Sequence, residues 1–262
     1  MLTPKKPSLM TEPALMLIPD LLDGPSILSI SDALLLQQIH YWCKKTFITD
    51  DDGDRILCYT YDQWQNQLPF FSTRWLMKIV QKLEAAGWIE VERGASYNRY
   101  KMGASSKDPK HANFFAGKLL MTGVGAVKVF PTLAMKFGVV EAIILQTLHI
   151  RTYKKADWWV KKTVREWHED MLPFVGERTL ERAFSKLGKL GVLVVEKTTN
   201  KGRNSKRLRV NYVGLANALS LQIENEPPKL HTLTAASSLA SASSSPASAK
   251  NSQMPAISSP LV

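Results

Sequence analysis

Residues 173–195 read PFVGERTLERAFSKLGKLGVLVV, and the rest of the chain can be interpreted from this stretch. Four apolar residues recur at the spacing of one helical face: Leu180, Phe184, Leu187 and Leu190. At about 100° per residue, the opposite face is polar, and its residues are Arg178, Arg182, Ser185 and Lys189. Glycine at 191 then ends the helix, because glycine adopts positive φ freely, and a β-branched run follows. The pattern predicts a helix with a cationic outer face that runs into a strand.

The same pattern occurs once more, 104 residues upstream. The shift aligns equivalent residues in pairs: Pro69 with Pro173, Arg74 with Arg178, Lys78 with Arg182, Leu83 with Leu187, and Gly87 with Gly191. Further upstream, residues 33–40 match residues 142–149. A repeat of this length implies two whole domains, since solenoid repeats are far shorter. A helix with a cationic outer face, followed by a glycine and a strand, is typical of a recognition helix that runs into the wing of a winged helix-turn-helix domain. We therefore expect an α+β chain, mainly α, of two tandem winged helix-turn-helix domains with a disordered C-terminal tail.

Changes in composition set the expected boundaries. They divide the chain into five segments: a flexible arm (1–13), a first winged-helix domain (14–102), a linker (103–117), a second, basic winged-helix domain (118–215) and a disordered tail (216–262). The tail is rich in Ser, Ala and Pro. Such a segment cannot bury enough apolar surface to offset the entropy lost on ordering.

The net charge of +11 is unevenly distributed. Residues 1–117 carry 13 Lys and Arg against 13 Asp and Glu, whereas residues 118–215 carry 19 against 8. A cationic excess confined to one repeat suits a polyanion, since neutralising phosphates releases condensed counterions. The alternative is a merely soluble basic surface. With the repeat taken into account, double-stranded DNA is the expected partner.

The candidate DNA-binding residues come from three segments. The second reader helix provides Arg178, Arg182, Ser185 and Lys189 for the major groove. The hairpin that follows provides Lys197, Lys201, Arg203, Lys206, Arg207 and Arg209 for flanking backbone or the minor groove. The first copy offers a weaker reader: Arg74, Lys78 and Gln81. Alternatively, the first domain forms a homodimer or recruits a replication protein such as a helicase or its loader.

Several phrases carry a resemblance to a known family. They are LQQIHYW (36–42), PFFSTRW (69–75), PTLAMKFG (131–138) and EAIILQTLH (141–149). Together with residues 173–191 they resemble the winged-helix domain of phage, plasmid and mobile-element replication proteins, a group similar to the N-terminal domain of DnaD-type replisome organisers. The resemblance implies DNA binding during replication initiation and no catalytic residue. The chain departs from it at Gly176 and Arg151, which stand where the first copy has Ser72 and Trp42. It also shows no helical oligomerisation domain.

The same surface would equally serve a transcriptional repressor or activator, so that alternative stays open. No enzyme is expected, because the sequence has no P-loop, no Cys/His metal spacing and no nucleophile with a base. No metal or other cofactor is expected. Cys43 and Cys58 lack paired spacing and are expected to be reduced. Without an apolar run of membrane length or a signal-like start, we expect a cytoplasmic protein with no membrane partner.

Some residues have both a chemical and a structural interpretation. The Asp spacing at 50–54 is similar to a calcium loop, but Arg55 occupies the place of the required glycine, so a solvated loop is favoured. His40 and His149 are equivalent in the two copies and are expected to cap or pack. Trp64 and Trp167 are expected to pack as well. Trp158 and Trp159 remain candidates for stacking on bases.

Overall fold

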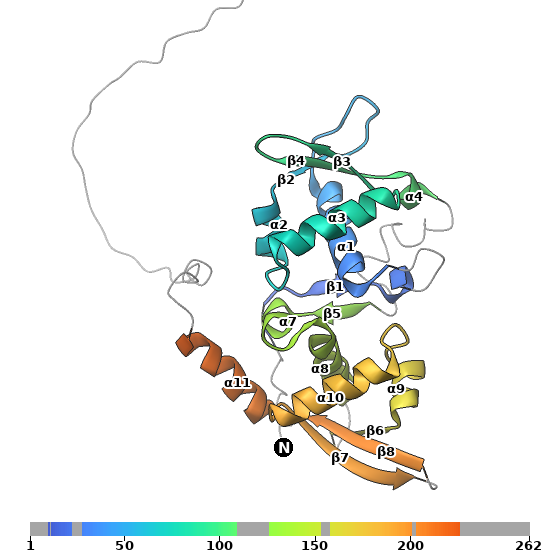
Figure 1. Cartoon of the computed structure of the whole chain (residues 1–262), viewed down its shortest axis with the longest axis vertical. Helices are drawn as coiled ribbons and strands as arrows, with labels where there is room; N and C mark the ends of the chain where they lie inside the picture. Colours follow the sequence, from blue (N-terminus) through green and yellow to red (C-terminus); the bar gives the residue numbers. More distant parts are fainter. Residues whose placement is uncertain are drawn as a thin grey trace, which may run out of the picture. The chain divides into compact units, whose positions relative to one another are not determined.

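The computed structural model describes residues 10, 12–22, 28–108, 126–152, 158–200 and 203–225. These residues form an α+β fold of helices and small antiparallel sheets (Figure 1). Most of the predicted arm, residues 109–117 of the predicted linker, Lys201, and the predicted tail beyond residue 225 lie outside the described residues.

The elements fall into two halves that repeat one order. The first half contains β1 (Leu15–Leu17), the short helix η1 (Pro19–Leu22), α1 (Ile30–Lys45), β2 (Leu57–Tyr59), α2 (Tyr61–Gln67), α3 (Thr73–Ala85), β3 (Ile89–Arg93), β4 (Asn98–Met102) and α4 (Ala104–Lys107). The second half contains β5 (Val127–Val129), α7 (Pro131–Phe137), α8 (Val139–Thr152), β6 (Val160–Lys162), α9 (Val164–Asp170), α10 (Glu177–Lys189), β7 (Leu193–Asn200), β8 (Arg203–Val210) and α11 (Tyr212–Asn225).

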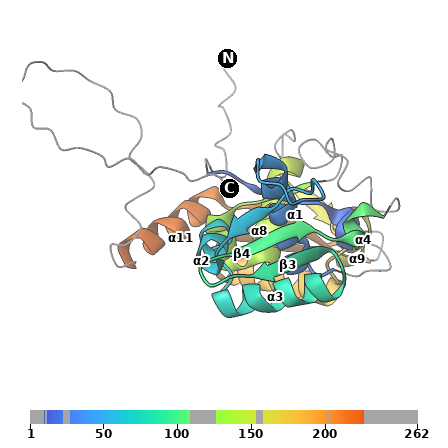
Figure 2. The ribbon, with the colours of Figure 1, turned by 90° about the horizontal axis from the view of Figure 1, so that it is seen from above.

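The two halves also share sheet topology. Each contains a three-stranded antiparallel sheet, in the order β2-β4-β3 in the first half and β6-β8-β7 in the second. In the first half β4 packs on α1 and β3 packs on α3, an arrangement that Figure 2 shows from above. In the second half β8 packs on α8 and β7 packs on α10. One face of each sheet therefore covers the helices, and the other face is turned away from them.

Local sequence signals fix the helix boundaries. The side chains of Thr60 and Thr163 accept hydrogen bonds from the backbone N–H groups of Gln63 and Glu166. In return, the side chains of Gln63 and Glu166 accept from the backbone N–H groups of the two threonines, which completes two capping boxes. Ser72 caps α3. The helices α3 and α10 are each followed by a glycine with positive φ, 71° at Gly87 and 69° at Gly191. This is the conformation that ends a helix at low cost.

Equivalent positions of α3 and α10 face the core. In α3 they are Leu76, Ile79, Val80 and Leu83, and in α10 they are Leu180, Ala183, Phe184 and Leu187. Leu190 was expected in this stripe, but that expectation is wrong because the helix ends at Lys189. Its side chain is 51% exposed. The buried set is nonetheless displaced by 104 residues throughout, as the sequence comparison predicts.

A small sheet joins the two halves. β1 pairs antiparallel with β5, and the register matches Leu15 with Val129, Met16 with Lys128, and Leu17 with Val127. The strands are equivalent elements of the repeat, displaced by 112 residues, and each packs on the first long helix of its own half. Two equivalent strands paired antiparallel about their own centres are related by a local twofold axis. The carboxylate of Glu12 adds two hydrogen bonds to Thr132, of 2.7 and 2.9 Å.

Three predicted boundaries need correction. The segment from 216 to 225 was assigned to a disordered tail, but it lies in α11, whose first turn is held by the Asn211 carboxamide accepting from the backbone N–H of Gly214. The first half continues beyond 102 into α4, because Gly103 donates to the Trp88 carbonyl. The third boundary is internal: residues 157–160 read DWWV, a mostly apolar run that the sequence favours as a strand, but β6 begins only at Val160. The chain turns before it at Trp158, where φ is +57°.

Candidate nucleic-acid interface

The outer face of α10 is cationic and open. Arg178, Arg182, Ser185 and Lys189 are all exposed, as the helical spacing predicts. None of the three cations forms an ion pair with a carboxylate of the described residues. Lys186, by contrast, is also exposed but pairs with Glu141 and donates to the Phe137 carbonyl. The helix thus carries one cation that is paired within the fold and three that have no ion pair with a described carboxylate.

The β7–β8 hairpin presents two faces, and its register determines which cations lie on each. Leu193 pairs with Val210 and Val195 with Leu208 on the face that covers the core. Two residues further along, Lys197 pairs with Lys206 on that same face.

Contacts with α10 confirm the orientation of this core-covering face. The Lys206 ammonium lies 5.8 Å from the Phe184 ring centroid and 3.9 Å from the Glu181 carboxylate. These two lysines therefore share a side of the sheet with α10.

The remaining described cations of the hairpin lie on the other face. Arg207 and Arg209 alternate with the buried Leu208 and Val210, so they point away from α10. The sequence places all these cations on one hairpin, and the register divides the described ones between its two faces. Sequence reasoning missed the split, although counting the period-two alternation back from Val210 would have found it. The side chain of Arg203 is outside the described set, as is Lys201.

The corresponding helix of the first half carries a mixed surface. Arg74, Lys78 and Gln81 are exposed on α3, as predicted. They share the helix with Trp75 and Met77, whose exposed fractions are 44% and 42%. Large apolar side chains beside few cations are typical of a protein contact more than of a phosphate contact.

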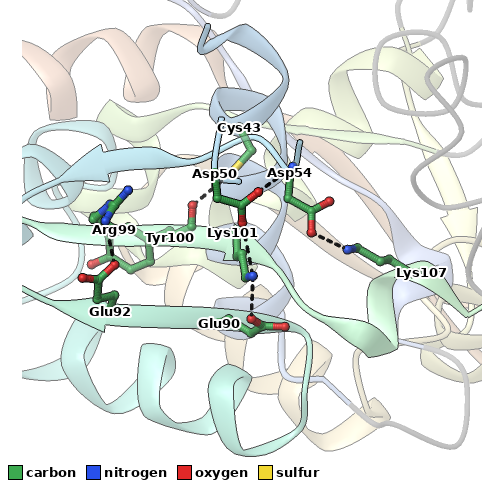
Figure 3. A network of polar contacts seen from close by, with 9 residues as sticks. All are labelled: Cys43, Asp50, Asp54, Glu90, Glu92, Arg99, Tyr100, Lys101 and Lys107. Carbon is green, nitrogen blue, oxygen red and sulfur yellow. Dashed lines mark hydrogen bonds and ion pairs between the residues drawn. The ribbon is translucent and has the colours of Figure 1, made fainter. Parts of the chain in front are cut away.

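The first hairpin differs most from the second. Lys101 on β4 lies between Asp50 at 3.3 Å and Glu90 at 3.2 Å, and these bonds raise its pKa. Arg99 lies 2.9 Å from Glu92 (Figure 3). Every described cation of this sheet is thus paired with a carboxylate.

The loop at 49–56 contributes to this neutral surface. Asp50 pairs with Lys101, and Asp54 pairs with Lys107 of α4 at 2.6 Å. The segment is a largely exposed turn, as expected, and its carboxylates form ion pairs with neighbouring lysines. A cleft of about 610 Å³ lies beside the loop, and its charged lining residues include Asp50 and Lys101.

The repeated histidines pack, as expected. His40 is buried, and its pKa is lowered from 6.5 to about 4 by burial and by the nearby Lys44. The Nδ1 atom of His149 lies 2.9 Å from the Tyr212 hydroxyl, at the start of α11. Trp64 and Trp167 are fully buried and cannot stack on a base.

No protein-family model matches the chain, and no curated protein is significantly similar to it. Among the described residues, no cluster of His, Cys, Asp and Glu could hold a metal ion. None of the helices in the described part of the chain combines the length and apolarity needed to cross a bilayer.

Proposed function

We propose that the chain is a DNA-binding protein built from two winged helices, with α10 as the principal reader. Arg178, Arg182, Ser185 and Lys189 would enter the major groove. Lys197 and Lys206 would contact the phosphates beside it from the same side of the protein. This is the docking geometry in which a reader helix contacts base edges and a wing contacts backbone.

One observation carries the proposal: Arg178, Arg182 and Lys189 are exposed and lack carboxylate partners among the described residues, whereas the cations of the first hairpin are all paired. Exposed, unpaired cations on a helix face repel one another, and a phosphate backbone relieves that repulsion.

The local twofold axis between β1 and β5 bears on how two DNA half-sites would be oriented. If both halves read DNA, and the relation between β1 and β5 also holds for α3 and α10, the half-sites are inverted with respect to one another. The half-site under α3 would contribute less, because Arg74, Lys78 and Gln81 provide fewer cations. In the alternative use of that helix, Trp75 and Met77 lead a contact with a helicase or loader, or with a second copy of the chain.

Within that class, the particular role we favour is replication initiation for a phage or mobile element in the cytoplasm. Its support is the resemblance of residues 36–42, 69–75 and 131–149 to the winged helices of such proteins. A transcriptional repressor or activator with the same surface is the second candidate. Both roles need sequence-specific duplex binding, so the DNA-binding proposal can be tested before the biological role.

The test is a duplex titration with charge reversal. Arg178→Glu/Arg182→Glu should weaken binding by at least about 30-fold, since each lost contact costs roughly 1–3 kcal/mol and repulsion is added. The matched control is Lys128→Glu/Lys136→Glu, which reverses two exposed cations on β5 and α7. Equal affinity of the two variants would refute the assignment of α10.

A second experiment separates the two roles. The binding site is first selected from random duplexes, and the selected sequence is then placed on a plasmid that lacks its own origin. Replication that depends on the protein and on Arg178 and Arg182 supports initiation. A footprint over a promoter, with altered transcription and no replication, supports regulation.

A further inference from the structure

The face of the second sheet that points away from α10 carries its own cationic group. Register and alternation place Lys161 of β6 beside Arg207 of β8, with Arg209 two residues further on. Val195 of β7 points toward α10, because a Cβ built on Gly188 of that helix would lie 3.4 Å from Cγ2 of Val195. The residues on either side of Val195 therefore point to the opposite face of the sheet. We call this outward group, together with Trp159, the outer cationic face.

An aromatic ring organises this face. The guanidinium carbons of Arg207 and Arg209 lie 4.6 and 4.7 Å from the centroid of the Trp159 ring. Cation–π attraction holds the two charges at one ring despite their mutual repulsion. The described carboxylate nearest to them is Glu196, 3.6 Å from Arg207. Three cations and one carboxylate leave the face with a net positive charge.

The first half provides an internal comparison. The equivalent face of its sheet carries Glu90 and Glu92 opposite Lys101 and Arg99, joined by ion pairs of 3.2 and 2.9 Å. Val194 and Glu196 occupy the two corresponding positions of β7. Valine therefore replaces one carboxylate of the first half. Both cations of the adjoining strand are retained, with Arg209 in the position of Lys101 and Arg207 in the position of Arg99. Lys161 replaces the uncharged Cys58 on the remaining strand.

We infer that the outer cationic face binds single-stranded DNA, a second nucleic-acid site that rests on the proposed function. A straight duplex seated on α10 faces the opposite side of the sheet, so these arginines cannot contact it there. An aromatic ring among arginines is the combination that binds single strands, because bases stack on aromatic and guanidinium planes while cations follow the phosphates. A protein with both sites can hold a duplex and a melted strand at the same time.

The experiment compares single-stranded and duplex binding in the full chain. Fluorescence anisotropy measures affinity for an oligothymidylate of about 20 nucleotides and for the selected duplex. Arg207→Gln/Arg209→Gln should lower affinity for the oligothymidylate by about 10-fold or more and leave duplex affinity within about 2-fold. Trp159→Leu should act in the same direction. Arg178→Gln/Arg182→Gln should show the reverse pattern, and Lys128→Gln/Lys136→Gln should change neither affinity.

The outcomes separate this inference from the proposed function. Loss of single-strand binding with intact duplex binding supports the outer site and also shows that the variant is folded. A wild-type protein that binds duplex but not oligothymidylate overturns the inference and leaves the α10 site standing. Equal losses for both ligands overturn it too, because Arg207 and Arg209 then belong to the duplex interface. Single-strand binding without any duplex binding keeps the inference and refutes the proposed function.

Discussion

The salt dependence of duplex binding tests the α10 surface quantitatively. The proposed duplex interface leaves out Lys186, which pairs with Glu141, and includes five described cations: Arg178, Arg182, Lys189, Lys197 and Lys206. Each phosphate neutralised on B-DNA contributes about 0.9 to the slope of log K against log salt. If all five meet phosphates, the slope is at most about −4.5. Raising salt from about 50 to 200 mM then lowers affinity by roughly 500-fold.

Arg178→Gln/Arg182→Gln removes two of these contacts. The slope should become less steep by about 1.8, so the same change of salt lowers affinity only about 40-fold. Anisotropy titrations at four salt concentrations measure both slopes. Arg74→Gln/Lys78→Gln on α3 is the matched comparison, and it should change the slope less than the α10 variant does. An unchanged slope for the α10 variant would show that neither arginine meets phosphate, whatever happens to the affinity itself.

Three further predictions concern the fold. Leu17→Ala should cost about 2–5 kcal/mol of unfolding free energy, because the side chain is fully buried where the two halves join. A loss below about 1 kcal/mol in urea would contradict that packing. The pKa of His40, about 4 against 6.5 when unfolded, means that its neutral form stabilises the fold above pH 6.5. Up to about 3 kcal/mol should be lost as the pH falls from 6.5 to 4, and urea titrations at several pH values should show this loss in wild type but not in His40→Gln. Gly191→Ala should cost about 1 kcal/mol for its φ of +69°, whereas Gly87→Ala should cost more in the same assay, since the new Cβ would lie 2.9 Å from Ser105 Oγ.

Much of the local structure was predictable because it depends on short-range rules. The capping residues Thr60, Thr163 and Ser72, and the glycines that end α3 and α10, act within a few residues of their own positions. The apolar stripe of α10 follows from helical periodicity alone, and so does the outward direction of Arg178. The prediction that Leu190 belongs to the buried stripe was wrong, because periodicity does not determine where a helix ends.

Long-range features were not predictable in the same way. Residues 14–18 and 126–130 could be matched as similar lead-ins, but nothing local to either segment says that β1 and β5 pair with each other. The split of the hairpin cations also depends on register, which places Arg207 and Lys206 on opposite faces. Composition averaged over 216–262 concealed the last turns of α11, because a long Ser- and Ala-rich segment follows them.

The joint between β1 and β5 has a consequence for how the two outer sheet faces can differ. An assembly of two identical subunits about a twofold axis must present every surface twice, so a substitution that makes one face basic makes its symmetry mate basic as well. Here both partners of the pseudosymmetric pair belong to one polypeptide. The ion-paired group around Lys101 and the two arginines on the Trp159 ring can therefore coexist at equivalent positions of the two sheets. Covalent linkage gives the protein a symmetric frame with asymmetric electrostatics.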